Sequence, residues 1–466
     1  MRRPPKSLTA ALLALVILSA PWGAPASDAR QTPSQQQPHQ TPSQQPPTTT
    51  QQQPARQRRQ VFPPEPRPAP GGPNASLFEN VTAVLRKSYH DERFRKEELP
   101  ALASRYAERA ARAKTIGEQR EVVQEFLSHI PATHLGLMSR RTYRYVMNEL
   151  AGRAYPTFGF QLVRIGREFY IFALLEGGPG LRAGLLSWDR VVTIDGTPVS
   201  ESARLDWRSD DAHLTDERDP PVHFLAAERG ETVKLRVERR PGKFLDLTVA
   251  AEDYSSFEAA KASARVMSVG GRRVGYIHFW FIHMTGVPEM LASKLTGEFR
   301  DCDAIVLDLR GRGGNGMAIQ TILDVLRKDG VDDEGLRPKG RRPFVALFDR
   351  QSRSAKDVLA YELKKTGLAR VVGEQTAGAV IPATFADVGH ETILMFPSFK
   401  LPRYTDVLEL RPVAPDVFVE RAGPLSAGAD PILDAGLAEA VRLLKSPASD
   451  LGMGSWPVRL SLAAGQ

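Results

Sequence analysis

The chain has 466 residues, 42% apolar and 25% charged, and this ordinary composition excludes a wholly disordered or fibrous protein. Its single cysteine, Cys302, excludes an intramolecular disulfide framework and any cysteine-clustered metal site. The formal charge of +8 does not indicate a nucleic-acid surface, because residues 1–26 and 27–73 each carry +3 and only about +2 remains for the rest.

Residues 1–26 are predicted to be an export signal. Three basic residues precede an apolar run at 8–20, and Ala24-Pro25-Ala26 offers a small-residue cleavage site. The run is too short to span a bilayer comfortably, and an uncleaved helix is the alternative interpretation. No other segment approaches 18 consecutive apolar residues. We therefore expect a periplasmic or extracellular protein without a transmembrane segment in the mature chain.

Residues 27–73 are predicted to be a disordered linker. Of these 47 residues, 12 are Gln and 12 are Pro, so the stretch has little to bury. Residues 76–152 then read as a helical N-terminal domain, and the apolar periodicity up to residue 130 predicts three helices. From residue 155 to 252, short apolar runs broken by Gly and Pro predict a small β-rich domain that ends near Tyr254. The polar stretch 201–222 reads as an insertion in it.

The stretch 264–445 alternates predicted strands and helices. Strands are expected around 275–281, 303–311, 343–349 and 369–374, and helices around 316–328 and 354–365. Such alternation is typical of parallel strands with crossover helices, an α/β core. Residues 446–466 form a C-terminal tail. The fold class is thus α/β and α+β multidomain.

The middle domain resembles a PDZ domain. Thr157-Phe158-Gly159-Phe160 stands where that family has its carboxylate-binding loop, and 180–185 with 189–196 resembles its Gly-Leu and Gly-Asp motifs. The resemblance implies that Phe158, Gly159 and Phe160 receive a peptide, which adds as a strand to a sheet edge. A PDZ fold that only packs against its neighbour is the alternative.

Four segments of the core carry the chemistry. Residues 308–316 form a glycine-rich turn between a strand and a helix, where backbone N–H groups can face an anion. Ser354 begins a helix that follows a strand, a position that favours developing negative charge. Taken singly, the turn could be only structural and Ser354 only an N-cap. Residues 371–379 and 409–416 complete the set.

These four segments, in this order, resemble the S41 serine peptidases, which include the C-terminal processing peptidases and the tricorn core protease. The resemblance covers roughly residues 76–445 and implies a ClpP/crotonase-like α/β peptidase core. The processing branch uses a Ser–Lys dyad, but Ala379 stands where its lysine falls. Helix geometry argues against Lys356, Lys364 and Lys365 as substitutes.

The tricorn-like branch uses Ser, His and Glu, and this chain offers matching residues. The resemblance implies Ser354 as nucleophile, His134 as base, Glu409 and Thr133 as orienting groups, and the N–H groups of Gly314 and Ala355 as the oxyanion hole. The other histidines near these segments and the cysteine have structural interpretations. His129 reads as a solvated or capping residue, His278 and His283 as strand or core positions, and Cys302 as a packing residue.

The predicted function is an exported serine endopeptidase that captures the C-terminus or an extended segment of a protein or peptide substrate. No cofactor, metal or nucleic acid is expected, and a homo-oligomer is left open. Three departures from the family pattern, Arg353, Lys356-Asp357 and Arg312, add positive charge near the site. This charge could select acidic or carboxylate-bearing substrates, or could mark a catalytically inactive, peptide-binding or scaffold relative.

Overall fold

The computed structural model describes residues 66–72, 75–208, 222–283, 285–329 and 342–445. The predicted export signal, most of the predicted linker and the predicted C-terminal tail lie outside the described residues. Among the described residues, no helix is long and apolar enough to cross a membrane.

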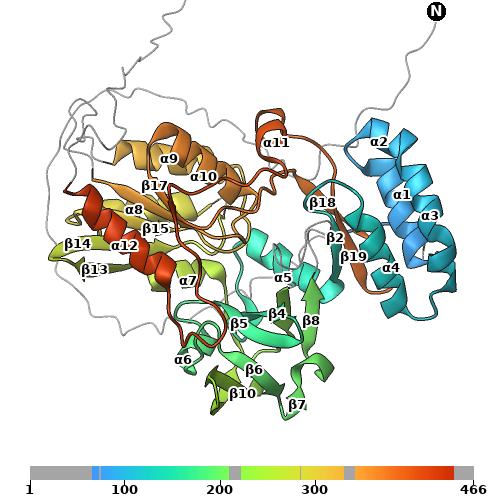
Figure 1. Ribbon diagram of the computed structural model, residues 1–466, viewed down its shortest axis with the longest axis horizontal. Coiled ribbons are helices and arrows are strands. Elements are labelled where there is room, and N and C mark those ends of the chain that lie inside the picture. The colour runs from blue at the N-terminus through green and yellow to red at the C-terminus, as the bar shows by residue number, and fades with distance from the viewer. Residues whose placement is uncertain (1–65, 73–74, 209–221, 284, 330–341, 446–466) are drawn as a thin grey trace, which may run out of the picture. The chain divides into compact units, whose positions relative to one another are not determined.

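Four helices, not three, form the start of the folded chain (Figure 1). They are α1 (Leu77–Ser88), α2 (Glu92–Glu97), α3 (Leu99–Arg112) and α4 (Ile116–Ser128). Capping boxes begin α1 at Ser76 and α4 at Thr115, and Asp91 caps α2. The additional helix is α2. It has six residues and a single buried apolar side chain, so the sequence shows no helical periodicity there.

The helices pack against a sheet whose strands come from distant parts of the chain. Strand β2 (Gly136–Ser139) pairs antiparallel with β19 (Thr392–Pro397), β19 with β18 (Ala383–Asp387), and β18 in parallel with β1 (Arg67–Pro68). Side chains from the helices and from β2, β18 and β19 share one apolar cluster.

Two expectations are corrected by this sheet. The linker does not extend to residue 73, because 67–69 pair with the edge of β18, where a proline without N–H is tolerated. The 383–397 hairpin lies within the stretch expected to form the core, yet it pairs with β2 instead of the parallel sheet. Helix α5 (Arg140–Leu150) then leads into the middle part of the chain.

The β-rich middle part runs from residue 155 to 254. Its strands are β3 (Tyr155–Thr157), β4 (Phe160–Ile165), β5 (Glu168–Leu174), β6 (Arg190–Ile194), β7 (Thr197–Pro198), β8 (Leu205–Arg208), β9 (Val222–Leu225), β10 (Thr232–Arg240), β11 (Lys243–Ala250) and β12 (Glu252–Tyr254). The short helices α6 (Pro179–Arg182) and η1 (Val199–Glu201) interrupt them. The polar stretch read as an insertion contributes β8, which pairs with β9, and β9 pairs with β4.

A six-stranded sheet carries the core, and its strand order is β13-β14-β15-β16-β17-β20. The strands are β13 (Arg265–Val269), β14 (Arg272–His278), β15 (Ala304–Asp308), β16 (Phe344–Phe348), β17 (Arg370–Gly373) and β20 (Val417–Phe418). All pairs except β13–β14 are parallel, so the predicted α/β core is confirmed.

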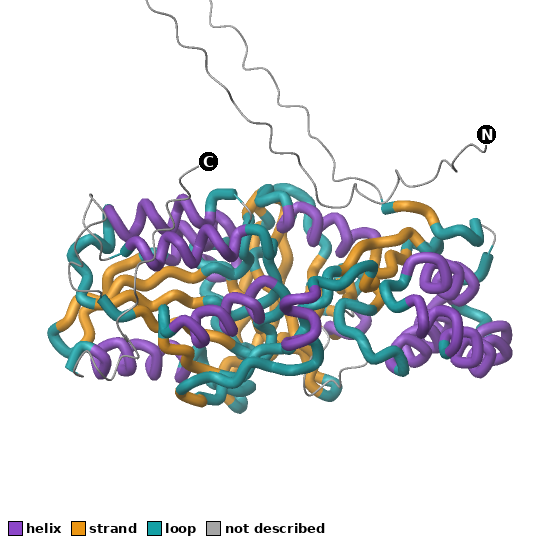
Figure 2. The backbone as a smooth tube through the Cα atoms, turned by 90° about the horizontal axis from the view of Figure 1, so that it is seen from above, coloured by secondary structure: helices purple, strands orange, loops and turns teal. Residues whose placement is uncertain are grey.

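Helices cover both faces of the core sheet. The helices that follow the middle part are α7 (Ser256–Ser263), α8 (Val287–Thr296), α9 (Ala318–Lys328), α10 (Ala355–Thr366), α11 (Pro402–Leu408) and α12 (Pro431–Leu443). Residues of α8, α9 and α10 share the apolar cluster on one face, and those of α12 belong to the cluster on the other. Figure 2 shows the strands between these layers. The carboxyl ends of the parallel strands are thereby left to loops, where α/β proteins place their ligands.

Candidate active site

Ser354 lies at the junction of β16 and α10 with a strained backbone. Its φ of 59° and ψ of −118° are unusual for a residue with a side chain, and such strain costs about 1–3 kcal/mol. The Ser354 N–H donates to the Ala379 carbonyl at 2.7 Å. Ser354 is partly exposed, while the next residues of α10 are buried. The strained junction therefore presents Ser354 at the surface of a rigid helix end.

Asp357 fixes the segment that receives Ser354. Its carboxylate accepts the N–H of Ser354 at 3.1 Å, of Gly378 at 2.9 Å and of Ala379 at 3.0 Å. Complete burial raises the pKa of Asp357 to about 6. The ionised form accepts all three bonds, so the carboxylate holds α10 and the 378–379 backbone together.

Glu409, Thr133 and His134 form a connected group. Glu409 Oε1 accepts the Thr133 N–H and the Thr133 hydroxyl, each at 2.8 Å. The Thr133 Oγ1 lies 3.3 Å from His134 Nδ1. Because the hydroxyl proton is committed to the carboxylate, Oγ1 offers only a lone pair to the ring, and His134 must carry its proton on Nδ1. The Nε2 atom is then the basic nitrogen.

The backbone of residues 378–381 joins this group to Ser354. Val380 N–H and Ile381 N–H donate to Glu409 Oε2 at 3.0 and 2.9 Å, directly after the Ala379 carbonyl that accepts from Ser354. A continuous hydrogen-bonded path therefore runs from the start of α10 to the His134 ring. The structure brings together Thr133, His134 and Glu409, which are up to 276 positions apart, and the 378–381 backbone connects them to Ser354.

A pocket of about 250 Å³ adjoins the Glu409 carboxylate. Its walls come from α2, from the start of the 131–134 segment and from residues 400–406. Glu409 is accordingly only half-buried. The Glu409 carboxylate is therefore partly accessible from this pocket.

The glycine-rich turn lies along the residues that follow β14. Gly311, Gly313 and Gly314 each approach a successive residue of the 280–282 stretch so closely that a Cβ would lie 2.5–3.0 Å from it. Ile282 forms a parallel bridge with Gly314 and accepts the Asn315 N–H at 2.7 Å. These approaches and the positive φ angles explain the glycines.

The predicted oxyanion donors occupy different parts of this region. Among the described residues, neither the Gly314 N–H nor the Ala355 N–H has an acceptor. Ala355 is the first residue of α10, whose N–H has no intrahelical partner. The Gly311 N–H, by contrast, donates to Asp349 and cannot serve.

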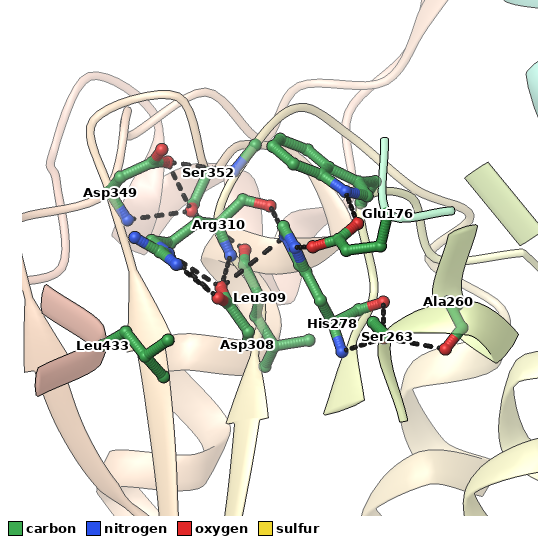
Figure 3. A network of polar contacts seen from close by, with 12 residues as sticks. Glu176, Ala260, Ser263, His278, Asp308, Leu309, Arg310, Asp349, Ser352 and Leu433 are labelled. Carbon is green, nitrogen blue, oxygen red and sulfur yellow. Dashed lines mark hydrogen bonds and ion pairs between the residues drawn. The ribbon is translucent and has the colours of Figure 1, made fainter. Parts of the chain in front are cut away.

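A buried polar network surrounds Arg310 and Asp308 at the start of the turn (Figure 3). Arg310 binds Asp308 at the end of β15 and Asp430 at the start of α12. His278 lies between Asp308 and Glu176 of the middle part, with Nδ1 2.7 Å from Glu176. Burial would lower the pKa of His278, but the two carboxylates outweigh it and raise the value. This agrees with the core position predicted for His278, whereas no pattern in the sequence points to Glu176.

The other rival residues have structural contacts. His129 ends α4 and contacts Tyr106 and Glu125. His283 and Cys302 are buried, and burial lowers the pKa of His283 to about 4. Among the described residues, no group of three or more His, Cys, Asp or Glu side chains could hold a metal ion.

The structure also places the three lysines rejected as substitutes for the family lysine, and two of the extra charges. Lys356 is fully buried and donates to three backbone carbonyls. Lys364 binds the Ala414 carbonyl, and Lys365 lies over the Tyr361 ring. Arg353 is only 2% exposed. Arg353 and Lys356 are thus buried, so their charges are not exposed to select acidic or carboxylate-bearing substrates.

The predicted peptide-binding loop differs from the expected arrangement. Phe158 and Phe160 are buried in the apolar cluster of the middle part. The strand that starts at Phe160, β4, is an interior strand, because β9 pairs with it at Leu162 and Val163. Strand addition needs unpaired backbone groups, so the chain's own β9 covers part of the edge expected to receive a peptide.

Comparisons with known proteins relate the core of the chain to a peptidase family. A profile of peptidase family S41 matches residues 273–419. The carboxyl-terminal-processing protease of a Picosynechococcus species is 23% identical over 345 residues, which cover 68% of this chain and 76% of that protein. The tricorn protease homolog 1 of Streptomyces coelicolor is 29% identical over 251 residues, or 48% of this chain and 23% of the relative.

One solved structure with a similar arrangement is a photosystem II D1 C-terminal processing protease. It has a TM-score of 0.45 and 18% identity, and the match covers 76% of this chain and 97% of that one. The profile match lies on the parallel sheet, the glycine-rich turn and Ser354. The core of the chain at residues 273–419 thus matches peptidase family S41, and relatives named as processing and tricorn proteases agree with a serine-type peptidase.

Proposed function

We propose that this chain is an exported endopeptidase that cleaves peptide bonds by acyl transfer at Ser354, with His134 as the base. The observation that supports this most is the hydrogen-bonded path from Ser354 through the 378–381 backbone and Glu409 to Thr133 and His134. A serine hydroxyl is a weak nucleophile, and it needs a base that a third group orients.

In the proposed reaction, Ser354 Oγ attacks the carbonyl carbon of the substrate while His134 Nε2 takes its proton. The tetrahedral oxyanion accepts the N–H groups of Gly314 and Ala355, and the Ala355 end of α10 adds a favourable dipole. The C–N bond then breaks, and His134 returns the proton to the leaving amine. Water, deprotonated by the same ring, releases the acyl group and restores Ser354.

Glu409 stabilises the imidazolium through Thr133 and keeps the proton on Nδ1 in the resting state. It acts on the ring through the Thr133 hydroxyl, which bridges the two groups. The Glu409 carboxylate accepts four hydrogen bonds. Its position is therefore fixed before substrate arrives, as electrostatic stabilisation requires.

The second candidate function is a peptide-binding or scaffold protein without catalysis. The observation in its favour is the departure of this chain from the lysine dyad at Ala379. PDZ-assisted capture belongs to either function. Because β9 pairs with β4, capture by strand addition would require β9 to leave that edge.

Covalent labelling decides between the two candidates. A fluorophosphonate phosphonylates an activated serine, with loss of fluoride from phosphorus and transfer of the serine proton to the base. We expect one probe per chain in the wild type and none in Ser354→Ala. The exposed Ser104→Ala variant is the matched control and should label like the wild type. A folded wild-type protein that does not label would support the scaffold.

A further inference from the structure

Lys356 stands out among the charged residues that the mechanism above does not use. It lies two residues after Ser354, on the first turn of α10, and its side chain is completely buried. Removing an ammonium group from water is costly unless its donors are satisfied. Its three donors have three acceptors: the carbonyls of Trp280 at 2.9 Å, Arg310 at 2.8 Å and Gly311 at 3.1 Å.

Two of those carbonyls belong to the glycine-rich turn, and the third belongs to the 280–282 stretch along which the turn lies. Arg310 and Gly311 start the turn, and Trp280 starts the stretch along which it lies. Gly311 packs on Trp280, and three residues later Gly314 packs on Ile282 and bridges to it. The position of the Gly314 N–H therefore follows from how the turn is fixed at Trp280, Arg310 and Gly311.

The same side chain is anchored in the helix that presents Ser354. Lys356 N–H donates to the Arg353 carbonyl at 3.1 Å, so its backbone is part of the first turn of α10. We infer that Lys356 is a positioning residue of the active site. It sets the distance from Ser354 and its neighbour Ala355 to the oxyanion donor Gly314. This inference rests on the proposed function, because it uses Ser354 as nucleophile and Gly314 as donor.

The number of donors on the side chain is essential to this role. Burial and Arg310 oppose the ammonium form of Lys356, while Asp349 and Asp308 favour it. An ammonium satisfies three carbonyls at once, whereas an apolar side chain of similar length satisfies none. Loss of the three bonds would leave the start of the turn with fewer contacts, among them the Gly311 bond to Asp349 and the Arg310 ion pairs.

The test compares Lys356→Met with Lys365→Met, an exposed lysine near the other end of the same helix. The measured quantities are the saturating labelling rate, the half-saturating concentration and the final stoichiometry with an alkyl fluorophosphonate. Removing one oxyanion donor costs about 10²–10³-fold in rate. For a displaced donor in Lys356→Met we expect a fall of about 10–100-fold, with an unchanged half-saturating concentration and one probe per chain at the end.

A purely structural role would give a different result. It would lower the final stoichiometry by the unfolded fraction and leave the rate of the labelled fraction unchanged. Lys356→Gln keeps an amide donor and should label at an intermediate rate; it carries the test if Lys356→Met does not fold. A folded Lys356→Met with the wild-type rate, or failure of both variants to fold, would overturn the inference. Labelling of Ser354→Ala would instead overturn the proposed function.

Discussion

Replacing Glu409 by glutamine tests how Glu409 acts on His134 through Thr133. The substitution keeps the shape of the side chain but exchanges one carboxylate oxygen for an NH₂ group. The best arrangement keeps the amide oxygen toward the N–H groups of Val380 and Ile381 and turns the NH₂ toward Thr133. There it can donate to the Thr133 hydroxyl oxygen, but the Thr133 N–H loses its acceptor.

The reversed hydrogen bond would change the tautomer of His134. Because the Thr133 oxygen now accepts from the introduced amide NH₂, its hydroxyl proton is free to donate to His134 Nδ1. The ring then carries its own proton on Nε2 and has no lone pair for Ser354. A wrong tautomer in a serine peptidase triad costs about 10⁴ in rate, so we expect a fall on the order of 10²–10⁴-fold in fluorophosphonate labelling.

The cost in stability should be smaller. One buried N–H without an acceptor costs about 1–3 kcal/mol, and Thr133 is completely buried. Urea unfolding of Glu409→Gln should therefore show a loss of about 1–3 kcal/mol. The large kinetic effect and the small thermodynamic effect are the signature of a changed proton position.

Two variants of Thr133 complete the test. Thr133→Ser keeps the bridging hydroxyl and should label at nearly the wild-type rate. Thr133→Val removes the hydroxyl that bridges Glu409 and the ring and should label about as slowly as Glu409→Gln. The action of Glu409 through Thr133 is refuted if folded Glu409→Gln and Thr133→Val both label at the wild-type rate.

Four further outcomes are expected. His134→Ala should lower the labelling rate on the order of 10³–10⁴-fold without rescue by Ala379→Lys, and full labelling of the folded variant would exclude His134 as the base. Asp357→Asn, which replaces one accepting oxygen with an NH₂ group and sets it against at least one of the three backbone N–H groups, should lower the rate at least about 10-fold, while Asp357→Glu should retain more activity. Burial lowers the pKa of Lys356 from 10.5 to about 7, so between these values the unfolded chain binds more protons and this group's contribution to stability rises with pH. The free energy of unfolding of the wild type minus that of Lys356→Met should thus increase from about pH 7 to about pH 9 in urea titrations, and a constant difference would contradict the assignment. N-terminal sequencing of protein from the native host should begin near Ser27, and an intact Met1 in a cytoplasmic fraction would exclude export.

The core could be predicted from the sequence because each strand there is a short, continuous apolar run. Strand β15 and strand β16 are buried at every position, as strands covered on both faces are, and the helices between them repeat every three to four residues. The turns between these elements are likewise marked by a few consecutive residues. Element order and parallel pairing followed from these patterns alone.

Pairings between distant segments could not be predicted in this way. Strand β1 is two residues in a proline-rich stretch, and β9 follows a polar one, so neither has a periodic pattern of its own. Each becomes a strand because a partner edge is available, which is a tertiary effect that overrides propensity. The sequence alone does not predict that β9 pairs with β4 and covers part of its edge.

The role of Lys356 was hidden for a related reason. Helical spacing shows that Lys356 and Ser354 point in different directions, and a lysine on a first helical turn normally faces solvent. Its burial depends on three carbonyls that lie 45 to 76 positions earlier in the chain. The local departure from the family pattern was visible, but its consequence depends on contacts that only the fold brings together.

Ala379 shows how the segment that bears a lysine in the processing peptidases is used here. Its side chain is completely buried, so a lysine at 379 would bring a charge into a space filled by a methyl group. The backbone, however, makes contacts on both sides: Ala379 binds Asp357 and Ser354, and Val380 and Ile381 bind Glu409. A segment that acts through its N–H and carbonyl groups tolerates a small side chain. The loss of the lysine is therefore compatible with an active site in which the proton is taken by His134, held in place through the same backbone.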